Sequence, residues 1–226
     1  MRRELAALDR AIGHPERPVM GIVGGSKVSS KIELLNHLVS QLDRLAIGGG
    51  MANTFLYAQG HEVAASYCEK DLADTAREIM ARAEAQGCEL LLPIDTVVGE
   101  HAQRGAAARV RGLGEIDEHE RILDAGPDTV ERLKHAMDAS KTLVWNGPLG
   151  VFEVPPFDHG TVEAARHAAM LVKAGKLVAV AGGGDTVAAL HAAGVAGDFT
   201  FVSTAGGAFL EWMEGKTLPG VEALKR

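Results

Sequence analysis

Six short runs rich in Val, Ile and Leu recur along the chain without alternation of apolar and polar residues. They are VMGIV (19–23), LAIGG (45–49), ELLLPI (89–94), TLVW (142–145), LVAVA (177–181) and FTFV (199–202). An uninterrupted apolar run is typical of a strand that is buried on both faces. Strands of this kind need covering layers above and below them, and this requirement limits the fold more than any other feature of the sequence.

Helical patterns between most of these runs can supply the covering layers. Apolar residues spaced as on one helix face form three stripes, which are Ile32, Leu35, Leu38, Val39 and Leu42; Leu72, Ala76, Ile79, Met80 and Ala83; and Val162, Ala165, Ala169 and Val172. Strands that alternate with helices predict βαβ units. We therefore expect the α/β class, as a three-layer Rossmann-like open parallel sheet with helices on both faces.

One domain is expected to take up the whole of residues 1–226, because no internal repeat, low-complexity tract or linker divides the chain. Residues 97–125 break the strand–helix rhythm and predict a looser excursion with short extra strands. Residues 1–18 predict a charged helix that ends at GHPERP, and residues 215–226 predict a turn and a C-terminal tail.

Charge and cysteine content exclude several classes of function. The formal net charge is −7 and the basic residues are scattered, which argues against a nucleic-acid partner. Cys68 and Cys88 are the only cysteines and form no CxxC motif, so neither a zinc site nor a disulfide framework is indicated. No apolar run approaches the ~18 residues of a membrane span. We expect a cytoplasmic protein with no membrane partner.

Glycine-rich turns follow five of the six apolar runs. They are GGSK (24–27), GGGMAN (48–53), NGPLG (146–150), GGGDT (182–186) and STAGGA (203–208). The carboxyl ends of parallel strands meet at one edge of an open α/β sheet, where ligands bind. Glycines let the backbone approach a ligand, and the next helix offers free N–H groups. One such turn is usually only a tight connection, but five at one edge favour a phosphate-binding site.

Two familiar phosphate-binding motifs do not fit. The P-loop pattern G-x-x-x-x-G-K-[ST], placed on Gly21, requires glycine where Ser26 stands and Ser or Thr where Val28 stands. The dinucleotide fingerprint G-x-G-x-x-G/A fails in GGGDTV at Val187 and in GGGMAN at Asn53. Hydride transfer therefore remains only a minor alternative, and no pattern supports serine hydrolase or zinc chemistry.

Lys27 and Lys31 are candidate phosphate ligands. We expect one to lie just before, and the other within, the first turn of the helix that follows the first strand. The spacing of four would place both ammonium groups on one side of that helix. Cations are repelled by the positive end of a helix dipole, so two of them there indicate an anion. The alternative is a pair of solvated surface lysines.

Further polar residues among the glycines have two possible roles each. Asp185 suits either a helix N-cap or a Mg²⁺ ion on nucleotide phosphates, and Thr186 adds a hydroxyl beside it. Glu153 suits a ribose contact or a plain surface position. Asn146 suits a turn or a phosphate contact.

Five motifs, taken together, resemble those of a known family. GGSKVSSKI, IGGGMANTFL, WNGPLGVFE, GGGDT and STAGGAFLEWMEGKTLPG occur here in the order and spacing seen in the C-terminal half of phosphoglycerate kinase. The resemblance runs essentially end to end and includes DAGPDT at 124–129. Each motif alone is a weak signal, but five in order are specific. One departure is Ala205, which stands where the family has the first glycine of its Ser-Thr-Gly-Gly-Gly-Ala motif.

The resemblance implies a kinase that reversibly transfers a phosphoryl group from 1,3-bisphosphoglycerate to ADP, giving 3-phosphoglycerate and ATP with Mg²⁺. Residues 1–226 would be the single C-terminal nucleotide-binding domain, with residues 1–18 as an interdomain helix and the N-terminal phosphoglycerate-binding domain absent. Such a chain would be an incomplete, monomeric enzyme that binds Mg-ADP or Mg-ATP with little or no turnover. A stand-alone nucleotide-binding module without catalysis is the alternative.

The resemblance also implies roles for individual residues. Those implied to act in catalysis are Lys27, Lys31, Gly184, Gly206 and Gly207, the last two at the helix start that meets the transferring phosphoryl group. Asp185 would hold Mg²⁺ on the nucleotide, with Gly183, Gly184 and Thr186 beside the phosphates. Glu153 would contact the ribose. The remaining nucleotide-binding positions are Gly25, Ser26, Gly49 and Val151 at the adenine, and Asn146 and Pro148 in the nearby strand-end turn.

Overall fold

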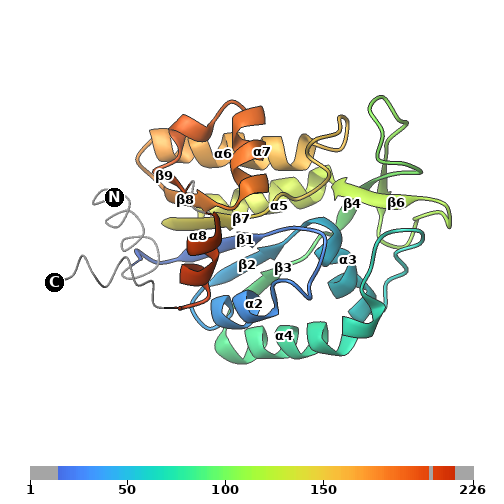
Figure 1. Ribbon diagram of the computed structural model, residues 1–226, viewed down its shortest axis with the longest axis horizontal. Helices are drawn as coiled ribbons and strands as arrows, with labels where there is room; N and C mark the ends of the chain where they lie inside the picture. The colour runs from blue at the N-terminus through green and yellow to red at the C-terminus, as the bar shows by residue number, and fades with distance from the viewer. Residues whose placement is uncertain (1–14, 204–205, 217–226) are drawn as a thin grey trace.

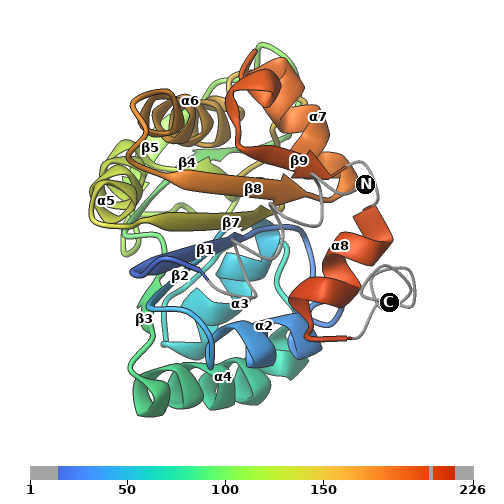
Figure 2. The same ribbon diagram turned by 90° about the vertical axis from the view of Figure 1, so that its left-hand side faces the viewer.

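The computed structural model describes residues 15–203 and 206–216 of the protein (Figure 1). A sheet of six strands crosses the middle of the molecule, and helices cover both of its faces (Figure 2). All neighbouring strands of this sheet are parallel. The predicted α/β class and the three-layer arrangement are confirmed.

The strand order in the main sheet is β3-β2-β1-β7-β8-β9. The strands are β1 (Val19–Val23), β2 (Arg44–Ile47), β3 (Glu89–Leu91), β7 (Thr142–Asn146), β8 (Val178–Gly182) and β9 (Phe201–Ser203). Each coincides largely with one of the six apolar runs. Every residue of the two central strands, β1 and β7, is buried, as expected of strands that are covered on both faces.

The helices are divided between the two faces (Figure 2). On one face lie α2 (Ile32–Leu38), α3 (Gly49–Ala58), α4 (Ala73–Gln86) and α8 (Gly206–Met213), and on the other α5 (Pro127–Asp138), α6 (His159–Lys173) and α7 (Gly184–Ala192). Short 3₁₀ turns occur at η2 (Lys70–Leu72) and η3 (Ala196–Asp198). Successive residues of β7 point to opposite faces, so Val144 belongs to one hydrophobic core and Leu143 and Trp145 to the other.

The predicted excursion folds into a small antiparallel sheet of its own, with strand order β5-β4-β6. Its strands are β4 (Asp95–Gly99), β5 (Arg109–Gly112) and β6 (Arg121–Ala125). The Glu120 side chain accepts hydrogen bonds from Arg109 and Arg111 and so ties β5 to the start of β6. The Val151 N–H donates to the Leu123 carbonyl at 2.8 Å, which joins β6 to the turn after β7. The small sheet therefore lies beside the carboxyl ends of the main strands.

The predicted helix over residues 1–18 falls mostly outside the described residues, and residues 15–18 are not helical. Of the predicted tail, only Gly215 and Lys216 are described. The Lys216 ammonium pairs with Glu33 at 3.0 Å and ties the end of α8 to α2. Within residues 15–203 and 206–216, no helix combines the length and the apolar character needed to cross a membrane.

Candidate functional site

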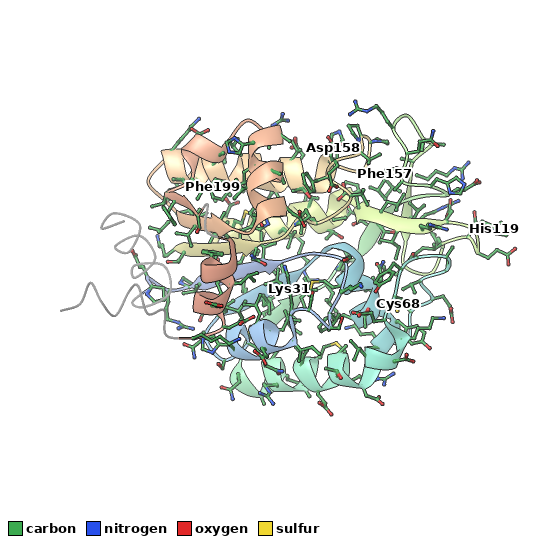
Figure 3. The ribbon with its side chains drawn as sticks, in the orientation of Figure 1. Lys31, Cys68, His119, Phe157, Asp158 and Phe199 are labelled. Carbon is green, nitrogen blue, oxygen red and sulfur yellow. The ribbon has the colours of Figure 1, made fainter. Side chains whose placement is uncertain are left out.

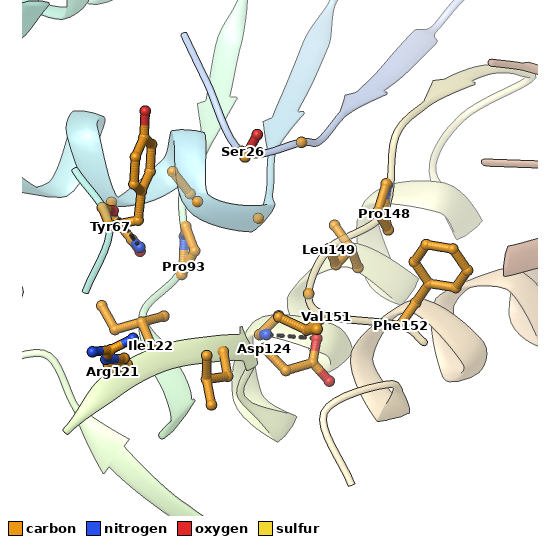
Figure 4. Close-up of a pocket in the computed structure, with 18 of the residues that line it drawn as sticks. Ser26, Tyr67, Pro93, Arg121, Ile122, Asp124, Pro148, Leu149, Val151 and Phe152 are labelled. Atoms are coloured by element: carbon orange, nitrogen blue, oxygen red, sulfur yellow. Dashed lines mark hydrogen bonds between the residues drawn. The ribbon is translucent and has the colours of Figure 1, made fainter. Parts of the chain in front are cut away.

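The strands that follow β1 are added on one side of it as far as β3, and those from β7 onward are added on the other side. The strand order therefore switches between β1 and β7, which are neighbours at the centre of the sheet. A cavity of about 400 Å³ opens at the carboxyl ends of the strands there (Figure 4). A crevice outside the strand ends at such a switch point is the usual ligand site of an open α/β sheet. Seven of the predicted nucleotide-binding residues line it: Gly25, Ser26, Gly49, Pro148, Val151, Glu153 and Asp185.

The glycines at this edge are required because the turns pack backbone against backbone. Gly49 has a φ of +68°, and a Cβ placed on it would lie 2.6 Å from the Gly25 carbonyl oxygen. That oxygen accepts a hydrogen bond from the Met51 N–H at 3.0 Å. The Gly49 N–H in turn donates to the Leu149 carbonyl at 2.8 Å. The turns after β1, β2 and β7 are thereby held together as one rim.

Buried threonine hydroxyls hold the turn after β7 in place. The Gly147 N–H donates to Thr186 Oγ1 at 2.6 Å, and the Leu149 N–H donates to Thr161 Oγ1 at 3.0 Å. Thr186 lies in the first turn of α7 and Thr161 in the first turn of α6. Two helix starts on the same face of the sheet therefore position the wall of the cavity that carries Pro148.

Lys31, labelled near the middle of the molecule in Figure 3, is largely buried, and its ammonium group lies among oxygen atoms. Lys31 Nζ donates to the Gly24 carbonyl at 2.6 Å, to Asn146 Oδ1 at 2.6 Å and to the Asn146 carbonyl at 3.3 Å. Burial lowers the pKa of Lys31 to about 8, against the opposing effect of the Asp185 carboxylate. Lys31 is thus a cation held beneath the turns at this edge of the sheet.

The two lysines are arranged differently from the prediction. Helix α2 begins at Ile32, with Lys31 as its N-cap residue, so both lysines precede the helix. The Lys31 N–H bonds to the Val28 carbonyl at 2.8 Å, which closes a turn between the two lysines. Lys27 is exposed and does not line the cavity. The expectation that one of the lysines lies within the first turn of the helix was wrong, because the helix begins only after this turn.

Asp185 lies in the first turn of α7, and its side chain is exposed at the cavity. The N-cap of this helix is Gly183, with a φ of +97°, and no side chain caps the helix. The N-cap interpretation of Asp185 is therefore wrong. Its carboxylate is available to hold Mg²⁺ together with phosphate oxygens. Among the described residues, no group of three or more His, Cys, Asp or Glu side chains could form a metal site.

Asp124 is the most deeply buried carboxylate at the cavity, and the sequence predicted no role for it. Its Oδ2 accepts from the Gly160 N–H at 2.7 Å, at the start of α6, and its Oδ1 from the Ala125 N–H at 2.9 Å (Figure 4). Burial raises the pKa of Asp124 to about 8, although these two N–H groups lower it. Asp124 thus ties the end of β6 to the first turn of α6.

Comparison with known proteins identifies the family. Residues 1–216 match the sequence profile of the family described as "Phosphoglycerate kinase". The chain belongs to the phosphoglycerate kinase family. It is 71% identical over 225 residues to a phosphoglycerate kinase of Caulobacter vibrioides and 60% identical over 226 residues to one of Xanthobacter autotrophicus. All of the chain is matched in both cases, but it spans only 57% of the length of each relative.

Solved structures of phosphoglycerate kinases have the same fold. The structure of phosphoglycerate kinase from Coxiella burnetii superimposes with a TM-score of 0.93 at 41% identity, covering 98% of this chain and 56% of that one. The enzyme from Pyrococcus horikoshii OT3 superimposes with a TM-score of 0.82 at 27% identity, covering 100% of this chain and 56% of that one.

The residues that the resemblance to phosphoglycerate kinase singled out fall into two groups. Seven line the cavity, as described above. The others lie around the strand ends without lining it, or begin a helix there. These are Lys27, Lys31, Asn146, Gly183, Gly184 and Thr186, together with Gly206 and Gly207, the first residues of α8.

The wall of the cavity opposite Pro148 was not found by sequence reasoning. Tyr67, Pro93, Arg121 and Ile122 form it (Figure 4). They come from a loop, the end of β3 and the small sheet, none of which carries a glycine-rich turn. The DAGPDT motif of the phosphoglycerate kinase resemblance, which begins at Asp124, was the only sequence signal near this wall.

Proposed function

We propose that this chain is the C-terminal, nucleotide-binding half of a phosphoglycerate kinase and that the cavity takes ADP or ATP with Mg²⁺. The observation that carries the proposal is the cavity itself, which gathers seven residues from four separate turns at the switch point of the sheet. In this proposal the base lies against Gly25, Gly49 and Val151, and Glu153 contacts the ribose. The phosphates extend toward Asp185, which holds Mg²⁺ at the start of α7.

The proposed reaction of the complete enzyme is the reversible transfer of a phosphoryl group between 1,3-bisphosphoglycerate and ADP, giving 3-phosphoglycerate and ATP. Phosphoryl transfer depends on alignment and on positive charge around the equatorial oxygens. Lys27, Lys31, Mg²⁺ and the first turns of α7 and α8 would supply that charge. The phosphoglycerate would bind to an N-terminal domain, so the chain by itself is proposed to bind nucleotide with little or no turnover. We further propose a monomer that works in the cytoplasm.

Calorimetric titration with Mg-ADP, Mg-ATP and NAD, alongside a coupled kinase assay, tests this proposal. We expect saturable binding of both adenine nucleotides, no binding of NAD and little or no turnover. Absence of Mg-ADP binding would overturn the nucleotide assignment, and NAD binding in its place would favour hydride transfer. Turnover at the rate of an intact phosphoglycerate kinase would overturn the proposal that the chain is half of an enzyme.

A further inference from the structure

Lys31 and Asn146 form one polar cluster with the ends of three strands. An ammonium group has three protons, and three oxygen atoms surround Lys31 Nζ at 2.6, 2.6 and 3.3 Å. Two of these oxygens belong to Asn146, at the end of β7, and the third is the carbonyl of Gly24, just after β1. The position of the ammonium group is therefore set by the two central strands.

The other end of the Asn146 carboxamide reaches the next strand. Asn146 is 2% exposed, and its Nδ2 donates to the Gly182 carbonyl, at the end of β8, at 2.9 Å. A Cβ placed on Gly183 would lie 2.8 Å from Nδ2, so the carboxamide supports the turn that opens α7. Only this orientation satisfies both ends, because a flipped amide would place its NH₂ group against the ammonium of Lys31.

The Asn146 side chain thereby fixes two positively charged features, the Lys31 ammonium group and the first turn of α7. The first turn of α7 presents free N–H groups and the positive end of the helix dipole. The charge of Asp185, in this turn, raises the pKa of Lys31, so the ammonium group and the turn interact electrostatically. An anion at the turn between β8 and α7 would be stabilised by both features together. The longest of the three lysine contacts, to the Asn146 carbonyl, is the one most easily exchanged for a phosphate oxygen.

We propose that Asn146 is a positioning residue, which through Lys31 and Gly182 holds the ammonium group and the first turn of α7 in register for the phosphates of the nucleotide. This inference rests on the proposed function. It gives Asn146 an indirect role, in which its carboxamide acts through the lysine and the turn.

The titration of Lys31 reports on this role directly. The pKa of Lys31 is about 8, where burial lowers it and Asp185 on α7 raises it, while β1 and β7 contribute neutral oxygens. Asn146→Ala removes an acceptor from the ammonium and should lower this pKa further. Asn146→Asp places a carboxylate there and should raise it. A merely structural role would not move the pKa in opposite directions.

The experiment measures the Lys31 pKa by NMR of ¹³Cε-labelled lysine, assigned with Lys31→Arg, and the Kd of Mg-ADP by calorimetry. We expect opposite pKa shifts in the two variants and an affinity at least roughly tenfold weaker in Asn146→Ala, the loss typical of a hydrogen bond to a charged group. Thr142→Val is the matched control. It removes a partly buried hydrogen bond, from Thr142 Oγ1 to the Glu16 carbonyl at 2.8 Å, at the opposite end of the same strand, and should change neither quantity.

The outcomes separate this inference from the proposed function. If the wild-type protein does not bind Mg-ADP, the proposed function fails. If it binds Mg-ADP while Asn146→Ala keeps the wild-type affinity and the wild-type Lys31 pKa, the inference on Asn146 alone is overturned. Should Asn146→Ala not fold, Asn146→Ser takes its place under the same criteria. In the wild-type protein Mg-ADP should raise the Lys31 pKa, and an unchanged value would also overturn the inference.

Discussion

Lys27 and Lys31 are four residues apart in the sequence but lie in different environments. Lys27 is exposed beside the turn after β1, whereas Lys31 is enclosed by the Gly24 and Asn146 oxygens. An exposed lysine can follow a phosphate group by rotating its side chain, and an enclosed lysine acts from a fixed point. In the proposed function, the two cations would therefore contact different parts of one anion.

The exposed position of Lys27 allows its role to be tested without disturbing the fold. Lys27→Ala should weaken Mg-ADP binding roughly tenfold or more, since a hydrogen bond to a charged group contributes about 1.5–3 kcal/mol. Its urea unfolding midpoint should stay at the wild-type value. Calorimetry and urea titration provide the two measurements. Lys176→Ala is the control, because Lys176 is also exposed but lies just before the amino end of β8, away from the cavity. Equal ADP affinity in the two variants would reject a phosphate role for Lys27.

Asp185 is expected to make nucleotide binding depend on magnesium. Asp185→Asn keeps the size of the side chain and removes the charge that a hard cation requires. The gain in ADP affinity on addition of Mg²⁺ should therefore be lost in the variant, while binding of metal-free ADP persists. Titration with ADP in EDTA and in excess Mg²⁺ gives both values. A variant that responds to Mg²⁺ as the wild type does would contradict the assignment.

Residues that line the cavity could be predicted where the neighbouring sequence shows their role. Gly25 and Gly49 follow apolar strands, and their need for close backbone approach is a local property that the sequence displays. Tyr67 and Arg121 reach the same cavity from a loop and from the small sheet. Their place depends on how distant segments pack, so no nearby residue pattern marks them. The inward direction of Lys31 was likewise hidden, because it follows from the turn that closes at Val28.

At the scale of elements, the cavity wall after β7 is held by the first turns of α6 and α7 and by the end of β6. The bonds from Leu149 to Thr161 and from Gly147 to Thr186 are buried, and so is the bond from Gly160 to Asp124. A buried N–H group without its acceptor is costly. The wall should therefore move only together with the two helices.

Asp124 should make the stability of this region depend on pH. Its pKa rises from 3.8 to about 8 on folding, so the folded state binds more protons between these values. The free energy of unfolding contributed by Asp124 is then greatest at low pH and declines as pH rises to about 8, by up to about 1.4 kcal/mol per pH unit. Urea unfolding of wild type and Asp124→Asn across this range measures it. The variant should lack this slope, and parallel curves would contradict the prediction.

Gly150 is required by the packing of the wall against β6. A Cβ on Gly150 would lie 2.2 Å from Asp124 Oδ1 and 2.7 Å from the Asp124 Cα, which is backbone and cannot rotate away. Gly150→Ala should therefore lower the free energy of unfolding by about 1–3 kcal/mol. Gly197→Ala is the control, because a Cβ there meets nothing within 4 Å, and it should stay within about 0.5 kcal/mol of wild type. Equal stability of the two variants would show that the wall can yield.

The main elements were predictable because a strand covered on both faces shows a continuous apolar run. The start of α2 was misplaced, since the turn at 28–31 has no strong breaker to distinguish it from a helix. The antiparallel pairing of β4, β5 and β6 could not be derived from residues 97–125 alone. Its register depends on side chains such as Glu120, which meets Arg109 and Arg111 only after the strands have paired.

At the scale of the whole molecule, the cavity joins both halves of the main sheet, so occupying it should stabilise the entire fold. A ligand at 100 times its Kd adds about 2.7 kcal/mol. For a chain of this size that corresponds to a rise in Tm of about 5–10 °C. Thermal unfolding monitored by circular dichroism with increasing Mg-ADP tests this prediction. A Tm that does not respond, under conditions where calorimetry shows binding, would mean that the cavity lies outside the cooperative unit.

The central place of β1 has a consequence for synthesis of the chain on the ribosome. One edge of β1 pairs with β2, which follows soon after it, but the other edge waits for β7 until residues 24–141 have been made. At 5–20 residues per second this interval is on the order of ten seconds. During that time the nascent chain carries an apolar strand with an open edge, which can pair with other chains. The pairing of β1 with the distant β7 places two strand ends beside each other at the cavity. The same pairing creates a period during synthesis in which the nascent chain is prone to aggregate.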